Sequence, residues 1–417
     1  MQPAEAPNPG WIVAATKPRL APIERRVFLL CSLVAFFDGF DTQSIGPAAA
    51  AIGTAVGVSV GELGPIFSAS QLGFLLGAMS FGALGDRFGR KRLLVGAVAI
   101  FALCSLGTAL VHSFDMLVAC RLFCGLGLGG ATPNFVGLVS EYTPPRLRAR
   151  VVTTMWAAVP FGGMVGSFAS SAVLPWLGWQ AMFHIGFAAP MALALLLVAM
   201  LPESREAPRV ATAEPRLTPL TALFAHGRAI GTLWLWLASF AVWMVLIVVA
   251  FWTPALLQRD GLSAASAATV LAFNNAGGVV GTLLVGAALS RIRPVVALLG
   301  ACIASGVAIA AIGVSAGHYT GLLFAASLAG FFASAAGGTM IAVAAEAYPT
   351  EARATGIGWA LGFGRLGSIA GPLAAGLLVA HGLPIAQFYL AAAIPAFVAA
   401  GFVFLLSRRL RSGEAGA

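Results

Sequence analysis

Charged residues are scarce in this sequence of 417 residues. Asp, Glu, Lys and Arg together make up 9% of the chain, while hydrophobic residues make up 59%. Soluble proteins carry about 25% charged residues, and so few charges cannot cover a soluble surface. The 50 glycines agree with this, because membrane helices use glycine where they pack closely. The composition therefore excludes a soluble protein and predicts one that crosses the membrane several times.

Signatures of metal, disulfide and nucleotide sites are also lacking. The five cysteines fall inside apolar stretches without metal-ligand spacing, so they behave as small apolar side chains. The chain has no Gly-Lys-Ser/Thr loop, which leaves ATP-driven transport without a site. Glycine patterns that begin at Gly125 and Gly362 fit a dinucleotide fingerprint, but neither follows a strand, so they favour helix packing. We expect no cofactor, no metal and no enzymatic activity.

Stretches without charged residues predict the membrane spans. A span needs about 20 mostly apolar residues, and turn signals at 175–178, 315–318 and 381–384 divide the three longest stretches in two. We therefore expect an all-α membrane protein with twelve transmembrane helices. The expected spans are 26–51, 62–84, 92–112, 115–141, 150–173, 179–201, 229–257, 263–289, 294–314, 320–345, 353–379 and 385–407.

The basic residues predict the orientation. Of the 24 lysines and arginines, all but three fall on one side of this arrangement; Arg259 lies on the other side, and Arg121 and Arg365 lie within spans. The positive-inside rule then places both termini in the cytoplasm, with the protein in the plasma (bacterial inner) membrane. The net charge of +9 is accordingly loop charge, and we expect no nucleic-acid partner. Residues 1–24 are polar and rich in proline, so we expect the first span to act as the insertion signal.

A polar linker divides the chain into two halves. We expect a cytoplasmic tail at 1–25, a six-helix bundle at 26–201, a linker at 202–228, a second bundle at 229–407 and a tail at 408–417. The halves repeat one another, since Glu141 and Arg148 recur as Glu346 and Arg353 with a proline at the same place between them. Such a pseudo-symmetric repeat is typical of transporters that bind substrate between two halves and work by alternating access.

Three motifs resemble those of the major facilitator superfamily. Residues 82–91, Gly-Ala-Leu-Gly-Asp-Arg-Phe-Gly-Arg-Lys, lie between the second and third spans and resemble its signature loop. Arg121 with the glycines that follow it is similar to the superfamily's fourth-span motif, and 202–204, Pro-Glu-Ser, to the motif that ends the sixth span. The resemblance covers all the spans and implies the major facilitator fold.

A narrower resemblance concerns the substrate. Residues 38–43, Asp-Gly-Phe-Asp-Thr-Gln, resemble the first-span signature of the aromatic acid:proton symporters, and 125–134 and 362–367 are also similar to that family. Ser290 departs from the pattern, because the family usually carries an Asp there. The resemblance implies import of an aromatic carboxylate, such as benzoate, a hydroxybenzoate or a phenylpropionate, together with protons. We expect a monomer whose other contacts are with membrane lipid.

Four charged side chains lie inside spans: Asp38, Asp41, Arg121 and Arg365. Each unpaired charge costs about 2.5–3.5 kcal/mol at the bilayer centre, which favours mutual neutralisation. They could be two ion pairs that only fix helix packing, or a polar site between the halves. As the only carboxylates within spans, Asp38 and Asp41 are the candidates for carrying the proton, and their spacing of three residues puts them on one helix face.

The substrate carboxylate has two candidate partners. Arg365 offers a planar donor fork that matches a carboxylate and stays charged where water is scarce. In the alternative interpretation, Arg121 holds the substrate and Arg365 balances Asp38. Polar and aromatic side chains could complete the site: Gln43, Asn274, Asn275, Phe36, Phe40, Trp243, Trp252 and Phe363. Adjacent residues do not share a helix face, so only one of the two asparagines can point into the site.

Charges at the predicted cytoplasmic ends of the spans are candidates for a gate. These residues are Asp86, Arg87, Arg90, Glu141, Arg148, Glu346 and Arg353. Charge pairs among them could close the cytoplasmic face. The alternative is that they only set the orientation, which explains the basic residues but not the repeated glutamates.

Two other functions remain open on the sequence. A proton antiporter that exports drugs or metabolites is one, because Gly367, Gly371 and Pro372 resemble an antiporter glycine motif. They lie in the eleventh span, however, and the expected fifth-span position at 160–163 has no Gly-Pro pair. The second is a membrane sensor that does not transport, which would require a soluble signalling domain.

Overall fold

The computed structural model describes residues 20–204, 223–224, 227–289, 291–349 and 352–412. Most of the expected N-terminal tail and linker, the end of the C-terminal tail and Ser290 lie outside these residues. All regular structure in the described residues is helical. The helices are α1 (Pro22–Val56), η1 (Val60–Leu63), α2 (Gly64–Phe88), α3 (Arg90–Ala109), α4 (Phe114–Tyr142), α5 (Pro145–Trp156), α6 (Ala158–Met200), α8 (Ala229–Arg259), α9 (Ala264–Ala288), α10 (Pro294–Val314), α11 (Tyr319–Ala347), α12 (Arg353–Ala380) and α13 (Ile385–Ser412).

The helices provide the twelve spans that the sequence predicts. Ten stretches of the described residues are long and apolar enough to cross a membrane. One of them, Pro145–Met200, has 56 residues and turns at Gly178, where φ is 73° and ψ is 176°, so it holds two spans. The 35-residue helix α1 is not among the ten, but it contains the predicted first span, 26–51. With α1 and the divided stretch, the count is twelve.

The predicted turns coincide with helix ends, but several helices are longer than the predicted spans. α10 ends and α11 begins on either side of 315–318, and α12 and α13 lie on either side of 381–384. At the other end of the molecule, α1 already begins at Pro22 and α13 continues to Ser412. An apolar window detects only the part of a helix inside the hydrocarbon, so it misses the charged turns beyond it.

Serine side chains begin two helices at the end of the molecule away from the linker. Ser113 precedes α4 and accepts a hydrogen bond from the Met116 amide at 3.3 Å. Ser263 precedes α9 and accepts one from the Ser266 amide at 3.1 Å. An N-terminal serine satisfies one of the free amides of the first helical turn. The short polar loops therefore fix where these helices start.

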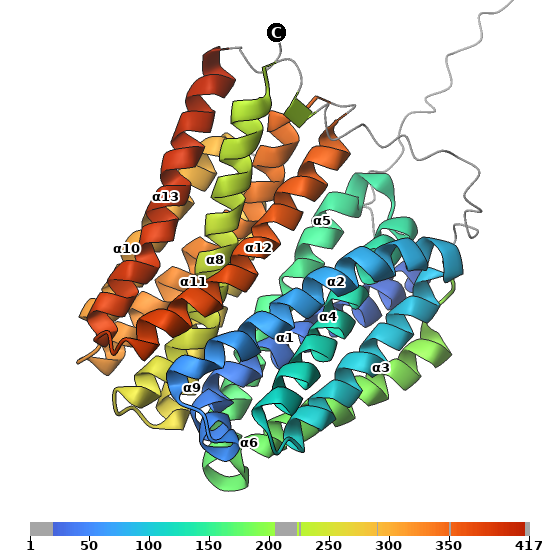
Figure 1. Cartoon of the computed structure of the whole chain (residues 1–417). Coiled ribbons are helices and arrows are strands. Elements are labelled where there is room, and N and C mark those ends of the chain that lie inside the picture. The colour runs from blue at the N-terminus through green and yellow to red at the C-terminus, as the bar shows by residue number, and fades with distance from the viewer. Residues whose placement is uncertain (1–19, 205–222, 225–226, 290, 350–351, 413–417) are drawn as a thin grey trace, which may run out of the picture.

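The helices form two bundles with equivalent packing (Figure 1). The first bundle is α1–α6 and the second is α8–α13. α2 packs on α4 and α1 on α6 in the first, as α9 packs on α11 and α8 on α12 in the second. Repeat-related glycines mark the same crossing, because a Cβ on Gly73 or Gly277 would lie 1.9 Å from a backbone oxygen of Leu122 or Ser327. The repeat in the sequence is thus a repeat in helix packing.

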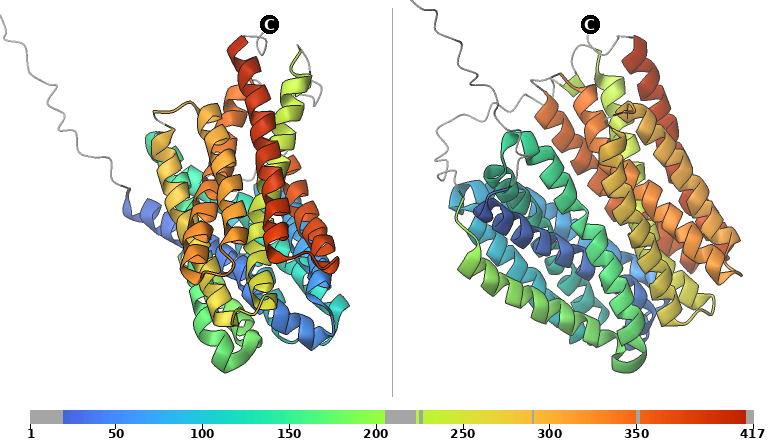
Figure 2. Two further views of the ribbon diagram at one scale, coloured as in Figure 1. Left: turned by 90° about the vertical axis from the view of Figure 1, so that its left-hand side faces the viewer. Right: turned by 180° about the vertical axis from the view of Figure 1, so that it is seen from behind.

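The bundles meet at one end of the molecule and separate at the other (Figures 1 and 2). We call the end that carries the linker and Ser412 the linker face, and the opposite end the far face. One apolar core at the far face combines both bundles, including Phe67 with Trp252. Near the linker face there are two separate cores, one built from each bundle. The structure is therefore closed at the far face.

Polar contacts reinforce this closure. Ser68 of α2 donates a hydrogen bond to the Ile369 carbonyl of α12 at 2.8 Å. Gln258 of α8 donates one to the Pro47 carbonyl of α1 at 3.0 Å. Both bonds join the two bundles at this face.

Candidate substrate and proton site

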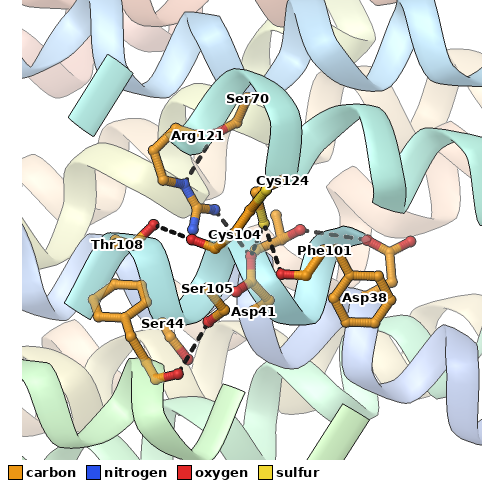
Figure 3. A network of polar contacts seen from close by, with 12 residues as sticks. Asp38, Asp41, Ser44, Ser70, Phe101, Cys104, Ser105, Thr108, Arg121 and Cys124 are labelled. Atoms are coloured by element: carbon orange, nitrogen blue, oxygen red, sulfur yellow. Dashed lines mark hydrogen bonds and ion pairs between the residues drawn. The ribbon is translucent and has the colours of Figure 1, made fainter. Parts of the chain in front are cut away.

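Asp41 and Arg121 form an ion pair inside the first bundle (Figure 3). Arg121 Nη2 lies 3.0 Å from Asp41 Oδ2, and both side chains are only 1% exposed. The Cys124 thiol donates to the same oxygen at 3.2 Å, and Arg121 Nε donates to Ser70 Oγ at 3.2 Å. The partners in these bonds belong to α1, α2 or α4, and the Phe183 ring of α6 lies 6.0 Å from Arg121 Cζ. The pair is therefore enclosed by one bundle and does not depend on the other.

Asp38 lies about one turn before Asp41 on α1 and has a different environment. Its residue is 6% exposed, and it accepts a hydrogen bond from Thr42 Oγ1 at 3.4 Å. It forms no ion pair within the described part of the chain. The other intramembrane arginine, Arg365, belongs to the second bundle. The two carboxylates of the 38–43 motif therefore differ: Asp41 is paired with Arg121, and Asp38 has no ion-pair partner among the described residues.

Arg365 is held by aromatic rings and not by acceptors. Its Cζ lies 3.9 Å from the ring centroid of Phe74 on α2 and 4.4 Å from that of Trp243 on α8. Among the described residues, no carbonyl, carboxylate or hydroxyl accepts a hydrogen bond from its guanidinium, and its residue remains partly exposed. Cation–π contacts contribute about 0.5–2 kcal/mol each, more when water is excluded. When arginine stacks on aromatic rings it does so through the faces of its guanidinium, which leaves the N–H edges available.

Asn274 packs within the second bundle, whereas Asn275 and Gln43 lie at the interface between the bundles. Asn274 donates a hydrogen bond to the Ala326 carbonyl of α11 at 3.0 Å, so it packs inside the second bundle. Asn275 faces the first bundle, because a Cβ on Gly163 would lie 2.7 Å from both Asn275 Oδ1 and Gln43 Cγ. Gln43 Oε1 is buried and has no partner among the described residues. Asn275 and Gln43 therefore meet between the bundles.

The ion pairs that the described residues show among the predicted gate charges lie within the first bundle. Arg90 pairs with Asp86 at 3.0 Å and with Glu141 at 2.6 Å, all within the first bundle. Glu141 also accepts a hydrogen bond from Ser204 at 2.7 Å. The Arg87 guanidinium lies 5.3 Å from the ring of Phe88, its neighbour in the chain.

The three remaining gate candidates, Arg148, Glu346 and Arg353, are exposed and form no ion pair with other described residues. The ion pairs seen at the linker face among the described residues lie within one bundle.

The predicted aromatic residues lie in different places. Trp243 is at Arg365, whereas Trp252 is fully buried in the far-face core. Phe36 and Phe40 stack together on α1 at 6.5 Å, and Phe363 stacks on Trp236 at 5.3 Å.

Four residues that contribute to the site were not predicted from the sequence: Phe74, Ser70, Cys124 and Gly163. Only Cys124 had a usable signal, since it follows Arg121 by three residues and so shares its helix face. An aromatic ring, a serine or a glycine in an apolar span is too common to single out.

Comparison with known proteins agrees with this architecture. The model of the Major Facilitator Superfamily matches residues 31–318. The chain belongs to the major facilitator superfamily. The relatives that it resembles are transporters and not enzymes, and the chain is a transporter.

Two similar relatives are named for aromatic acids. The 3-(3-hydroxy-phenyl)propionate transporter of Escherichia coli (strain K12) is 40% identical over 386 residues, which cover 92% of this chain and 94% of the relative. The 4-hydroxybenzoate transporter PcaK of Pseudomonas aeruginosa is 35% identical, with 93% of each chain covered.

A solved structure supports the fold. A bacterial homologue of the human lysosomal transporter Spinster, in an inward-facing and unoccupied conformation, matches with a TM-score of 0.76. It is 20% identical, and the match covers 94% of this chain and 99% of that one. At this identity the likeness concerns the superfamily fold alone.

Proposed function

We propose that this protein imports a small aromatic carboxylate together with protons by alternating access. The observation that carries the proposal is a single arginine, Arg365, which lies against one aromatic ring from each bundle and has no hydrogen-bond acceptor among the described residues. The names of the relatives supply the aromatic substrate class. The protein acts as a monomer in the bacterial inner membrane, and the linker face, which carries nearly all the basic loop residues, lies in the cytoplasm.

In this mechanism Arg365 binds the substrate carboxylate and Asp38 carries the proton. A guanidinium binds a carboxylate through two parallel hydrogen bonds. Binding neutralises Arg365 and weakens its positive field at Asp38, which favours uptake of a proton by that carboxylate. Substrate and proton are then bound together without a separate relay. Asp41 and Arg121 remain paired and keep α1 and α4 together through the transport cycle.

The remaining polar residues orient the substrate and close the cytoplasmic side. Gln43 and Asn275 are placed between the bundles to hydrogen-bond substituents on the substrate ring. When the far face opens, the linker face closes and brings Glu346 and Arg353 towards Asp86, Arg90 and Arg148. The charge cluster around Arg90 is then part of the cytoplasmic gate.

The proposal is tested with purified protein in proteoliposomes. A labelled panel of benzoate, 4-hydroxybenzoate, 3-phenylpropionate and the aliphatic acid muconate is offered under an inward proton gradient, with and without an uncoupler. We expect accumulation of aromatic acids that the uncoupler abolishes. One proton per monoanion is electroneutral, whereas each further proton adds about 2.3 kcal/mol per 100 mV of membrane potential, so the dependence on potential gives the stoichiometry.

The antiporter alternative predicts the opposite response. An outward proton gradient would then drive accumulation, and an inward one would deplete the vesicles. Equal accumulation with and without any proton gradient would rule out both coupled mechanisms.

A further inference from the structure

We propose that Phe74 and Trp243 form an aromatic slot at Arg365 that selects planar aromatic acids over non-planar acids of similar size. The inference rests on the proposed function, in which Arg365 binds the substrate carboxylate. Phe74 comes from α2 in the first bundle, and Trp243 and Arg365 come from α8 and α12 in the second. The slot therefore has one wall from each bundle.

The two rings flank the guanidinium. Its Cζ lies 3.9 Å from the Phe74 centroid and 4.4 Å from the Trp243 centroid. The two rings make no aromatic contact with each other in the part of the chain that the structure describes, so they do not lie together on one side. Arginine stacks on aromatic rings through its flat faces, and its five N–H donors point outward in the plane. The rings therefore fix that plane and leave the donor edge open.

A substrate bound to this edge has to share the plane. In a bidentate pair the carboxylate lies in the plane of the guanidinium. In benzoate-type acids the carboxylate is conjugated with the ring and nearly coplanar with it, so the adjoining edge of the ring also enters the layer between Phe74 and Trp243. Aromatic rings in contact gain from offset stacking or edge-to-face packing. A saturated ring is thicker and has no π-system, so it fits this layer less well.

Close packing holds Trp243 beside Arg365. A Cβ on Gly364 would lie 2.5 Å from Trp243 Cδ1 and 2.6 Å from Ser239 Oγ, so only glycine lets α12 approach α8 here. Gly364 directly precedes Arg365 in the chain. Trp243 and Arg365 thus belong to one tightly packed crossing, and they move together when the bundle moves.

Phe74 makes the slot depend on the arrangement of the bundles. It is 8% exposed and lies about two turns from Ser68, whose hydroxyl joins α2 to α12 at 2.8 Å. Trp243 stands at the position of the second half that matches Asp38 in the first. The duplicated position therefore supplies a proton-carrying carboxylate in one bundle and a wall of the slot in the other.

The test measures selectivity with the purified full-length protein. Dissociation constants are determined for two pairs of acids: benzoate with cyclohexanecarboxylate, and 3-phenylpropionate with 3-cyclohexylpropionate. We expect the wild type to prefer the aromatic member of at least one pair. Phe74→Leu and Trp243→Leu should each lower that preference at least fivefold, about 1 kcal/mol. Trp243→Phe keeps a ring and should retain most of it.

Phe81→Leu is the matched control, because Phe81 lies on the same helix but packs against Gly130 of α4 and not against Arg365. It should leave the preference unchanged. If Trp243→Leu does not fold, the comparison of Phe74→Leu with Phe81→Leu still tests whether the slot sets the preference for aromatic acids.

Two results would overturn the slot. One is an unchanged preference in both leucine variants, and the other is an equal loss of affinity for aromatic and saturated acids, which would mean that the rings only support Arg365. A wild type that binds no aromatic acid would instead refute the proposed function, and the slot with it.

Discussion

Two acid–arginine combinations lie about one helical turn apart in this protein, and they are built in different ways. Asp41 and Arg121 form a direct ion pair whose partners all come from the first bundle. Asp38 and Arg365 come from different bundles, and in the described part of the chain they form no ion pair and have few hydrogen-bonding partners. A buried pair that loses one member is strongly destabilised, which makes the first combination suited to a fixed role. The second can change partners at small cost, as a substrate and proton site must.

The largest effect is expected when the Asp38–Arg365 combination loses its carboxylate. One pH unit of gradient can concentrate a monoanion about tenfold through a one-to-one symport, since it supplies about 1.4 kcal/mol. Asp38→Asn cannot release a proton, so accumulation should fall to simple equilibration. Exchange of internal for external labelled substrate should survive, because Arg365 is intact. Undiminished proton-driven accumulation in Asp38→Asn would exclude it as the proton carrier.

Breaking the enclosed pair should affect stability before it affects coupling. Asp41→Asn or Arg121→Gln leaves one buried charge without its partner, which costs about 3–5 kcal/mol. Denaturation in mixed micelles measures this, and the double variant should lose less than the sum of the two single variants. Asp38→Asn is the control and should change the free energy of unfolding by about 1 kcal/mol or less. Equal losses of unfolding free energy in Asp38→Asn and Asp41→Asn would show that the two carboxylates contribute equally to stability, contrary to this comparison.

Exchanging the arginines for lysines should distinguish the two sites by substrate binding. Lysine keeps the charge but not the planar fork. Arg365→Lys should weaken binding of the aromatic acid at least tenfold, about 1.4 kcal/mol. Arg121→Lys should bind normally wherever it folds, because Arg121 is engaged by Asp41 and Ser70. The reverse pattern would assign the substrate to Arg121.

The smallest effect concerns the thiol that completes the enclosed pair. Cys124→Ala removes a weak donor from Asp41 Oδ2, which should lower the free energy of unfolding by about 1 kcal/mol. Cys124→Ser keeps a donor and should recover most of this. Proton-driven accumulation should be the same in both variants. A coupling defect in Cys124→Ala that Cys124→Ser repairs would give Asp41 a part in carrying the proton.

Much of the site could be predicted because intramembrane charge is rare. Asp38, Asp41, Arg121 and Arg365 stand out in apolar spans, and the spacing of three residues placed Asp38 and Asp41 on one helix face. The walls of the site could not be predicted in the same way. Phe74 is one of 28 phenylalanines, and nothing local distinguishes it from a ring that faces lipid. Likewise, adjacency shows that Asn274 and Asn275 point in different directions, but only the neighbouring helices show which one faces the first bundle.

By itself, the sequence determined that the protein has twelve spans in two repeated halves, with basic residues on one side and four charges within the spans. These features follow from local chemistry: apolar length, turn residues and the cost of charge in hydrocarbon act along one segment at a time. Only the tertiary structure decided that Arg121 pairs with Asp41, that Arg365 lies between Phe74 and Trp243, and that the bundles close at the far face. Each of these depends on side chains far apart in the chain meeting at helix crossings, where a glycine's missing Cβ sets how closely two backbones approach.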